Sequence, residues 1–311
     1  MTTSLFPPLL KVGVFPDRID QKLHQIFQLF KTDDLAGDPA LGARIEGIVT
    51  RSNYRIAESL IDSLPGLRII ATNGVGYDGI PVEYAASKGI VVTNTPDVLN
   101  EAVAELAVGL LLSLLRRIPA ADVFVKSGAW QAGQFSLSTT LAGKKVGVVG
   151  LGRIGREIVQ RLLPFRVGIG YFGRSRQDVE WDYFDDVEKL ARYADVLMVC
   201  CPGGPATHQL IDAGVLRALG PAGVLVNIAR GSVVNEAQLC AALADGTIAG
   251  AALDVFNEEP LGDSPLRGFP NVVLTPHMGS ATNETRLQMA QLAIDNLTGF
   301  FKTGKALTPV G

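Results

Sequence analysis

The sequence predicts an α/β fold made of two doubly wound domains, each built on a parallel sheet. Short runs rich in Val and Ile alternate with longer segments of helical periodicity, and this alternation is typical of βαβ units. At roughly 150 residues per domain, a chain of 311 residues is long enough for two domains with separate cores. A GxGxxG segment also lies between a predicted strand and a predicted helix in the second half of the chain.

The first part of the chain contains four predicted strands and several helical segments. In the first helical segment the apolar stripe consists of Leu23, Ile26, Phe27 and Phe30, and His24 is expected on the surface. The four strands are predicted at Lys11–Phe15, Ile45–Thr50, Arg68–Ala71 and Ile90–Thr93.

The longest apolar run, Ala102–Leu115, follows these strands. It contains Glu105 and is too short to cross a bilayer, so we expect a buried helix and no membrane partner. We expect the chain to cross from one domain to the next near residues 94–100. A loop at 126–144 then leads into the second domain.

Six further strands are predicted in the second part of the chain. After Thr282 the pattern is helical again, and no further strand is expected. The six strands are predicted at Lys145–Val149, Val167–Phe172, Asp195–Cys200, Gly223–Ile228, Gly250–Val255 and Asn271–Thr275.

The composition excludes several classes of protein. The chain carries 28 Lys and Arg against 31 Asp and Glu, and this net charge of −3 predicts no basic surface for a nucleic acid. Hydrophobic residues make up 47% and charged residues 19%, which argues against disorder and against a coiled coil. The three cysteines form no disulfide framework and no CxxC pair, so we expect a cytoplasmic protein without a metal site.

The glycine-rich segment predicts a dinucleotide-binding site. It follows the strand Lys145–Val149 and precedes a helical pattern, Arg156–Leu163. In such a segment the glycines permit a tight turn, close approach of the backbone to a pyrophosphate, and close packing of helix on strand. The predicted contacts are Gly150, Leu151, Gly152, Arg153, Ile154 and Gly155.

The end of the next strand indicates which dinucleotide is bound. About 20 residues after the first glycine, an NAD-binding site usually has an acidic residue for the ribose 2′-hydroxyl. Here the chain has Gly173, Arg174 and Ser175, and a guanidinium beside a hydroxyl suits a 2′-phosphate. We therefore predict NADP(H) in preference to NAD(H). The alternative is that Arg174 is a solvated loop residue and Asp178 binds the hydroxyl.

Titratable side chains follow each of three successive predicted strands. Arg230 comes after Gly223–Ile228, Glu258 and Glu259 after Gly250–Val255, and His277 after Asn271–Thr275. A sheet of this kind binds ligands at the carboxyl ends of its strands, where the glycine-rich segment also lies. His208 follows a strand end too, but no acidic residue is placed to orient it.

These residue types suit hydride transfer to a 2-keto acid. Hydride arriving at a carbonyl carbon leaves charge on the oxygen, and His277 is the candidate proton donor. Glu259 would fix its tautomer and stabilise the imidazolium. Arg230 would bind the substrate carboxylate and polarise the carbonyl.

At these residues the sequence resembles the D-isomer-specific 2-hydroxyacid dehydrogenase family. The resemblance maps the family's catalytic Arg, Glu and His onto Arg230, Glu259 and His277, with Glu259 favoured over Glu258 because it directly precedes a proline. The motifs that carry the resemblance are Gly74–Asp78, Thr93–Pro96, Gly150–Gly155, Asn227–Gly231, Leu253–Phe256, Glu259–Pro260 and Pro276–Thr282.

The resemblance also implies the domain organisation. It predicts a discontinuous, flavodoxin-like substrate-binding domain at 1–96 and 284–311, a Rossmann cofactor domain at 97–283, and a cleft between them. The backbone of Val75 and Gly76 would hold the substrate carboxylate, and Ile228 and Asp254 would contact the cofactor. A homodimer joined through the cofactor domains would bury the Ala102–Leu115 helix.

Within the family, the sequence most resembles the NADPH-dependent glyoxylate/hydroxypyruvate reductases. The segments behind this are Gly173–Ser175 and Asn94–Leu99. The predicted substrate is thus a small 2-keto acid that is reduced to the D-2-hydroxy acid. An aromatic 2-keto acid such as hydroxyphenylpyruvate remains an alternative, as does a nucleotide-sensing corepressor on the same fold.

Overall fold

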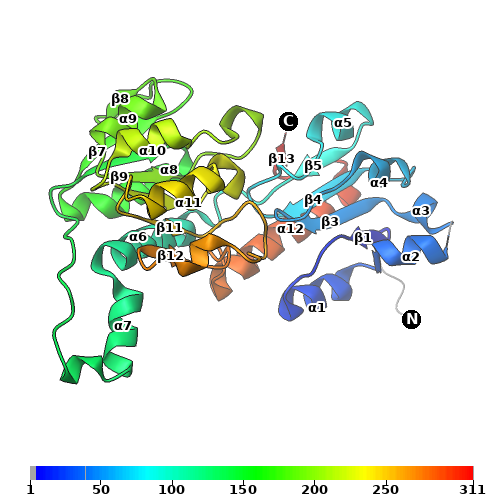
Figure 1. Cartoon of the computed structure of the whole chain (residues 1–311). Coiled ribbons are helices and arrows are strands. Elements are labelled where there is room, and N and C mark those ends of the chain that lie inside the picture. The colour runs from blue at the N-terminus through cyan, green and yellow to red at the C-terminus, as the bar shows by residue number, and fades with distance from the viewer. Residues whose placement is uncertain (1–4, 39, 311) are drawn as a thin grey trace. The chain divides into compact units, whose positions relative to one another are not determined.

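The computed structural model describes residues 5–38 and 40–310, which divide into two α/β units (Figure 1). The smaller unit consists of the chain up to Leu99 together with the segment from Ala281 onward. The larger unit is the continuous segment Asn100–Ser280. Each unit has its own sheet and its own buried core.

The sheet of the smaller unit is parallel apart from one edge strand. Its order is β13-β5-β4-β3-β1-β2, and the order β2-β1-β3-β4-β5 within it is that of flavodoxin-like folds. Only β13 is antiparallel to its neighbour. The strands are β1 Leu9–Lys11, β2 Leu29–Lys31, β3 Gly47–Arg51, β4 Ile69–Asn73, β5 Val91–Thr93 and β13 Pro309–Val310.

Three expectations for this unit were wrong. The first strand ends at Lys11 rather than Phe15, because Gly13 turns the chain with a φ of +95°. Phe30 belongs to β2 and not to the preceding helix, since its backbone pairs beside Leu10. A strand does follow Thr282: β13 has only two residues and is specified by pairing with β5, so it has no periodic pattern of its own.

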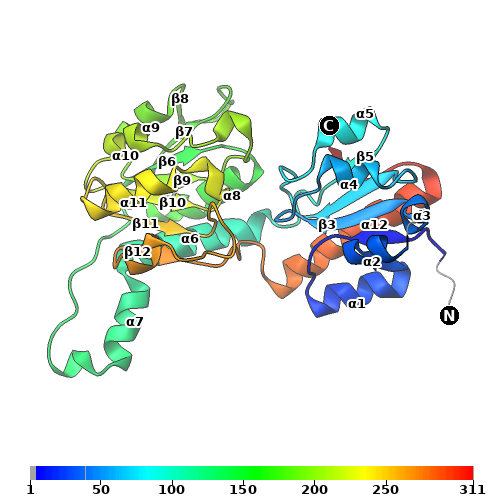
Figure 2. The same ribbon diagram turned by 45° about the vertical axis from the view of Figure 1, so that its right-hand side comes forward.

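Helices cover both faces of this sheet (Figure 2). One face packs on α1 (Asp17–Ile26) and α12 (Asn283–Thr303), whose buried side chains join those of Leu9, Val49 and Ile69. Side chains alternate between the faces of a strand, so Leu10 and Ile48 face the opposite side. The helices on that side are α2 Thr32–Gly37, α3 Leu41–Arg44, α4 Glu58–Asp62 and α5 Val82–Ser87.

The larger unit has a seven-stranded parallel sheet in the order β12-β11-β10-β9-β6-β7-β8. In chain order this is the Rossmann arrangement 3-2-1-4-5-6 with one further strand. The order reverses between β6 and β9, which is where such sheets bind ligands. The strands are β6 Lys145–Val149, β7 Gly168–Phe172, β8 Asp182–Phe184, β9 Val196–Val199, β10 Val224–Asn227, β11 Gly250–Leu253 and β12 Val272–Leu274.

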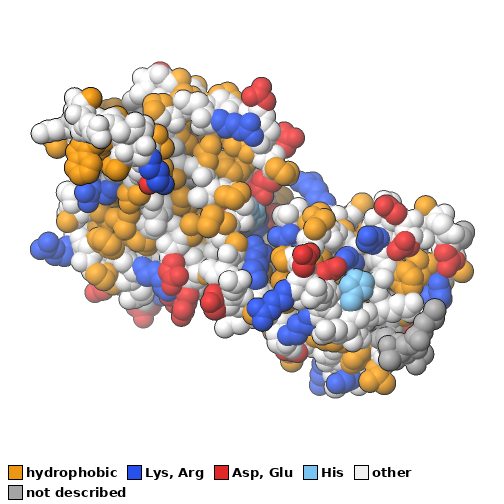
Figure 3. Space-filling model, turned by 90° about the horizontal axis from the view of Figure 1, so that it is seen from below, with side chains coloured by type: hydrophobic (Ala, Val, Ile, Leu, Met, Phe, Trp, Pro, Cys, Tyr) orange, Lys and Arg blue, Asp and Glu red, His pale blue; other side chains and the backbone are white. Residues whose placement is uncertain are grey.

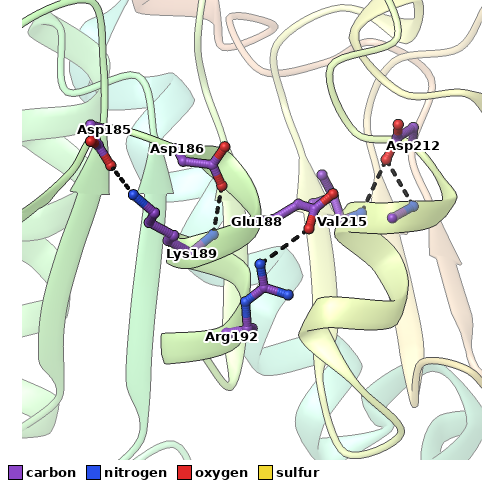
Figure 4. A network of polar contacts seen from close by, with 8 residues as sticks. Asp185, Asp186, Glu188, Lys189, Arg192, Asp212 and Val215 are labelled. Carbon is purple, nitrogen blue, oxygen red and sulfur yellow. Dashed lines mark hydrogen bonds and ion pairs between the residues drawn. The ribbon is translucent and has the colours of Figure 1, made fainter.

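The helices of the larger unit start at capping residues in several cases. Asp186 accepts a hydrogen bond from the Lys189 amide at the start of α9, and Asp212 accepts from Gly214 and Val215 at the start of α10 (Figure 4). Such caps satisfy amides that have no partner within the helix. The helices are α6 Asn100–Arg116, α8 Arg153–Leu162, α9 Val187–Tyr193, α10 Ala213–Leu219 and α11 Glu236–Ala244.

Helix α6 is buried within the chain. Its apolar side chains, including Leu110, Leu111 and Leu114, pack against α8 and β11. These contacts within the larger unit bury one face of the helix, as a buried helix was expected from the sequence. Within the part of the chain that the structure describes, no helix has the length and apolar character needed to cross a membrane.

Residues 117–140, which we call the arm, extend away from the sheet of the larger unit (Figure 1). The arm begins with α7 (Ile118–Lys126), which has no buried residue. Its base is closed by a hydrogen bond of 3.0 Å from Arg116 Nε to Ser138 Oγ and by a backbone hydrogen bond from Thr139 to Leu115.

Candidate active site

The glycine-rich turn after β6 lies where the strand order reverses. Gly150 has a φ of +99°, and a Cβ there would lie 2.7 Å from the Cα of Cys201, the second residue after β9. A Cβ on Gly155 would lie 2.3 Å from the carbonyl oxygen of Gly150, so this glycine allows α8 to approach the turn. A Cβ on Gly152 would meet nothing within 4 Å. The turn is thus tight on the protein side and open at Gly152.

Helix α8 starts at Arg153, directly after Gly152, and no side chain caps its first turn. Its first amides are therefore available to an anion, and a helix N-terminus favours negative charge. The predicted residues Leu151, Arg153 and Ile154 belong to this turn and the start of the helix. The residues present suit a dinucleotide pyrophosphate.

Gln177 ties the loop after β7 to the glycine-rich turn. Its Nε2 donates to the carbonyl of Leu151 at 2.8 Å, its Oε1 accepts from Arg156, and its backbone amide donates to the hydroxyl of buried Tyr171 at 2.7 Å. The sequence analysis missed this residue, because a glutamine in a polar loop carries no signal of its own. The one indication in the sequence was that Gln177 lies two residues after Ser175, in the loop expected to contact the nucleotide.

The loop between β7 and Gln177 presents the residues expected to contact a 2′-phosphate. Gly173 follows β7 directly, and the side chains of Arg174 and Ser175 are exposed. They therefore follow the carboxyl end of the strand next to β6, as the sequence predicted.

His277 and Glu259 are in direct contact. His277 Nδ1 lies 2.6 Å from Glu259 Oε2, and Glu259 Oε1 accepts a hydrogen bond from the amide of Phe256 at 3.1 Å. Burial raises the pKa of Glu259, but the hydrogen bond and charge of His277, the Phe256 amide and the charge of Arg230 outweigh it, so the pKa lies below its usual value. The side chains are 32% and 26% exposed, which leaves the imidazole accessible to a substrate.

The Arg230 loop is packed against the chain segment that leads to Glu259. A Cβ on Gly231 would lie 1.9 Å from the carbonyl carbon of Phe256, so only glycine allows this approach. Arg230 donates to the carbonyl of Ala229 at 2.6 Å and is partly exposed. The three predicted catalytic residues, Arg230, Glu259 and His277, thus follow the carboxyl ends of β10, β11 and β12.

Asp254 is buried directly after β11, next to Ile228, which follows β10. Its carboxylate accepts hydrogen bonds from Thr275 Oγ1 at 2.7 Å and from the amides of Met278 and Gly279 at 2.8 and 2.9 Å. Burial raises its pKa, while these hydrogen bonds and His277 oppose the rise. Asp254 thus holds both amides that follow His277, whose φ is +48°.

In the smaller unit, Val75 and Gly76 lie in the loop after β4. Both are partly exposed, whereas Asn73 and Gly74 before them are buried. The other histidines lack an acidic partner comparable to Glu259: His208 is exposed, and His24 lies 3.6 Å from Asp20 on the surface of α1, as expected. Among residues 5–38 and 40–310, no group of three or more His, Cys, Asp or Glu could hold a metal ion.

Comparison with known proteins identifies the family. The sequence profile of the D-isomer specific 2-hydroxyacid dehydrogenase NAD-binding domain matches residues 108–279. The chain belongs to this family. The matched segment covers the glycine-rich turn, Arg230, Glu259 and His277.

Several relatives within the 2-hydroxyacid dehydrogenase family are similar along most of their length. Hydroxyphenylpyruvate reductase of Plectranthus scutellarioides is 45% identical, over 94% of this chain and 95% of its own. Glyoxylate/hydroxypyruvate reductase A of Arabidopsis thaliana is 46% identical, over 86% and 85%. The crystal structure of NADPH-dependent glyoxylate/hydroxypyruvate reductase from Sinorhizobium meliloti, in complex with NADP and malonate, is 45% identical and covers 98% of this chain and 97% of its own, with a TM-score of 0.93.

Proposed function

We propose that the protein reduces a small 2-keto acid, glyoxylate or hydroxypyruvate, to the 2-hydroxy acid with NADPH, and that His277 donates the proton. The contact of 2.6 Å between His277 and Glu259, at the sheet edge that carries Arg230, is the observation on which the proposal rests. The product is the D-hydroxy acid where it is chiral.

In the proposed mechanism, each residue has a separate role. NADPH, when bound, supplies the hydride. His277 protonates the developing alkoxide through its Nε2, since Nδ1 is bonded to Glu259. Glu259 fixes the imidazole orientation and stabilises its protonated form. The guanidinium of Arg230 attracts the carboxylate and polarises the carbonyl. The backbone N–H groups of Val75 and Gly76 hold the carboxylate.

The residues proposed to bind the nucleotide also have separate roles. The glycine-rich turn and the start of α8 bind the pyrophosphate, and Arg174 and Ser175 bind the 2′-phosphate. Ile228 and Asp254 would contact the nicotinamide end of the cofactor. The match to a reductase solved with NADP supports NADP(H) in preference to NAD(H).

A second candidate substrate is an aromatic 2-keto acid. The similarity to a hydroxyphenylpyruvate reductase over 94% of the chain favours it. The same catalytic groups would act, and only the pocket for the substrate side chain would differ. The same assay separates the two.

We also propose a homodimer that forms through the arm of the larger unit. Five large apolar side chains of the arm are more than half exposed. Figure 3 shows hydrophobic side chains at the surface of the larger unit on the face seen from below. Several large apolar side chains exposed on one segment are typical of an interaction surface. The side chains are Ile118, Val123, Val125, Trp130 and Leu137.

The proposed function is tested by a panel of 2-keto acids, including glyoxylate, hydroxypyruvate and hydroxyphenylpyruvate, each assayed with NADPH and with NADH. We expect turnover with NADPH and the two small acids. Higher kcat/KM with hydroxyphenylpyruvate would support the second candidate. Tight NADPH binding without turnover of any acid would support a nucleotide-sensing corepressor instead.

A further inference from the structure

Two residues that follow β5, Asn94 and Thr95, form hydrogen bonds to the loop proposed to hold the substrate carboxylate. The backbone amide of Thr95 donates to the carbonyl of Gly74 at 2.9 Å. The side-chain Nδ2 of Asn94 donates to the carbonyl of Val75, also at 2.9 Å. Both donors therefore bind carbonyl groups of the loop and not its N–H groups.

These two hydrogen bonds determine where the loop N–H groups point. In a planar trans peptide the C=O of one residue and the N–H of the next point in opposite directions. Fixing the Gly74 carbonyl thus fixes the Val75 N–H, and fixing the Val75 carbonyl fixes the Gly76 N–H. Because the two carbonyls point toward Asn94 and Thr95, the N–H groups of Val75 and Gly76 point away from these residues. This orientation lets the N–H groups bind an anion on the side of the loop opposite Asn94 and Thr95.

Asn94 is in turn held by Thr308, beyond the last helix. Thr308 Oγ1 donates to the carbonyl of Asn94 at 2.6 Å, and the amide of Asn94 donates to the carbonyl of Thr308 at 3.3 Å. Thr308 directly precedes β13, which pairs with β5, and this end of the chain lies beside β5 (Figure 1).

Thr308 is held by Asn296, a fully buried side chain of α12. Asn296 Oδ1 accepts from the amides of Leu307 and Thr308 at 3.0 and 2.9 Å. Its Nδ2 donates to Thr308 Oγ1 at 2.8 Å and to the carbonyl of Leu292 at 2.9 Å. The amide is thus bonded at every donor and acceptor site, as a buried polar group must be to avoid a large desolvation cost.

We propose that Asn296 and Thr308 are positioning residues for the substrate carboxylate, acting through Asn94 on the N–H groups of Val75 and Gly76. This inference rests on the proposed function, because it takes a 2-keto acid as the ligand of the loop. It also gives a role to the Asn94–Thr95 motif, which the catalytic residues leave unexplained.

The test is Thr308→Val, which has nearly the same shape but no hydroxyl. Thr308→Ser keeps the hydroxyl and serves as the rescue variant. Thr298→Val is the matched control, because the Thr298 hydroxyl bonds only to carbonyls of its own helix, α12. We measure kcat and KM for glyoxylate and hydroxypyruvate, KM for NADPH, and Tm.

Thr308→Val is expected to raise KM for both keto acids roughly 3- to 10-fold, the effect of losing one well-made hydrogen bond, while KM for NADPH stays within about twofold. Thr308→Ser and Thr298→Val should keep the KM of the wild type. A role confined to stability would lower Tm and leave KM for the keto acids unchanged, and that result would overturn the inference.

A failure of the proposed function gives a different result. In that case the wild-type protein itself turns over neither glyoxylate nor hydroxypyruvate with NADPH, and the proposed role of Asn296 and Thr308 in binding the substrate carboxylate is wrong as well. If the wild type is active and Thr308→Val has the KM of the wild type, the positioning role alone is wrong. Asn94→Ala, which removes the donor to the Val75 carbonyl directly, should raise KM for the keto acids at least as much as Thr308→Val.

Discussion

The backbone of His277 is in the left-handed region, which residues other than glycine seldom adopt. A φ of +48° costs a non-glycine residue about 1–2 kcal/mol. The hydrogen bonds from Met278 and Gly279 to Asp254 offset this cost, and Glu259 holds the ring. Strain of this kind is concentrated at functional sites. At the scale of single residues, Glu259 therefore positions the ring of His277, and Asp254 positions the backbone that follows it.

The first prediction concerns the pair His277 and Glu259. Reduction needs the protonated imidazole, so kcat/KM for the keto acid should fall as pH rises, and kcat/KM for oxidation of the hydroxy acid should rise. Because the pKa of Glu259 lies below its usual value, its carboxylate is ionised throughout the neutral range and favours the imidazolium. Glu259→Gln should therefore move the fall in reduction to lower pH.

His277→Ala should lower kcat for reduction ~10²–10⁴-fold, the usual contribution of a general acid. Glu258→Gln is the control, since this exposed neighbour lacks the contact with His277 that Glu259 makes. An unchanged pH profile in Glu259→Gln, or loss of turnover in His208→Ala but not in His277→Ala, would show that the proton donor is assigned wrongly.

The second prediction concerns the choice of nucleotide. If Arg174 binds a 2′-phosphate, Arg174→Ala should weaken kcat/KM for NADPH by about 1.5–3 kcal/mol, the range for a hydrogen bond to a charged group, and leave NADH largely unaffected. Arg192→Ala is the control, because Arg192 is an exposed residue of the same unit that pairs with Glu188 (Figure 4). Equal losses with NADPH and NADH would contradict the assignment.

At the scale of elements, the loops after β10 and β11 depend on one glycine. Gly231→Ala would push a methyl group into the backbone of Phe256, so we expect the free energy of unfolding to fall by about 1–3 kcal/mol. The shift would also displace Arg230 relative to Glu259 and raise KM for the keto acid.

Gly268→Ala is the matched control, since a Cβ at that position would meet nothing within 4 Å. Denaturant unfolding and steady-state kinetics check both variants. Wild-type stability and KM in Gly231→Ala would mean that the contact with Phe256 relaxes without consequence.

The predictability of the strands differs with their length and burial. β6 was predicted with its observed bounds, because a buried parallel strand is a continuous apolar run. β2, β8 and β13 were missed. Each has three residues or fewer and depends on backbone pairing with a neighbour, a contact with no counterpart in local periodicity.

The site divides in the same way. His277 and Glu259 could be paired from the sequence, because each follows one of two neighbouring parallel strands and the family's motif orders them. Gln177 and Asn296 could not, since their roles depend on side-chain hydrogen bonds across loops and across more than ten residues of chain.

At the scale of the whole molecule, the arm provides the prediction on assembly. In sedimentation experiments we expect the wild-type protein at twice the chain mass of 33.0 kDa. Val123→Asp together with Val125→Asp should shift it toward the monomer, because charge in an apolar interface is costly to desolvate. Leu5→Asp, at an exposed residue of the smaller unit, is the control and should leave the mass unchanged. A wild-type monomer at micromolar concentration would contradict the proposal.

The discontinuous smaller unit has a consequence for how the protein is made. Residues 100–280 leave the ribosome before α12 and β13, so the larger unit can fold while the smaller one still lacks a helix and an edge strand. Until then, β5 has an unpaired edge, and the sheet face that contains Ile69 is uncovered. The sheet of the smaller unit is therefore completed only when the segment with Asn296 and Thr308 has been synthesised. The larger unit can fold before this happens.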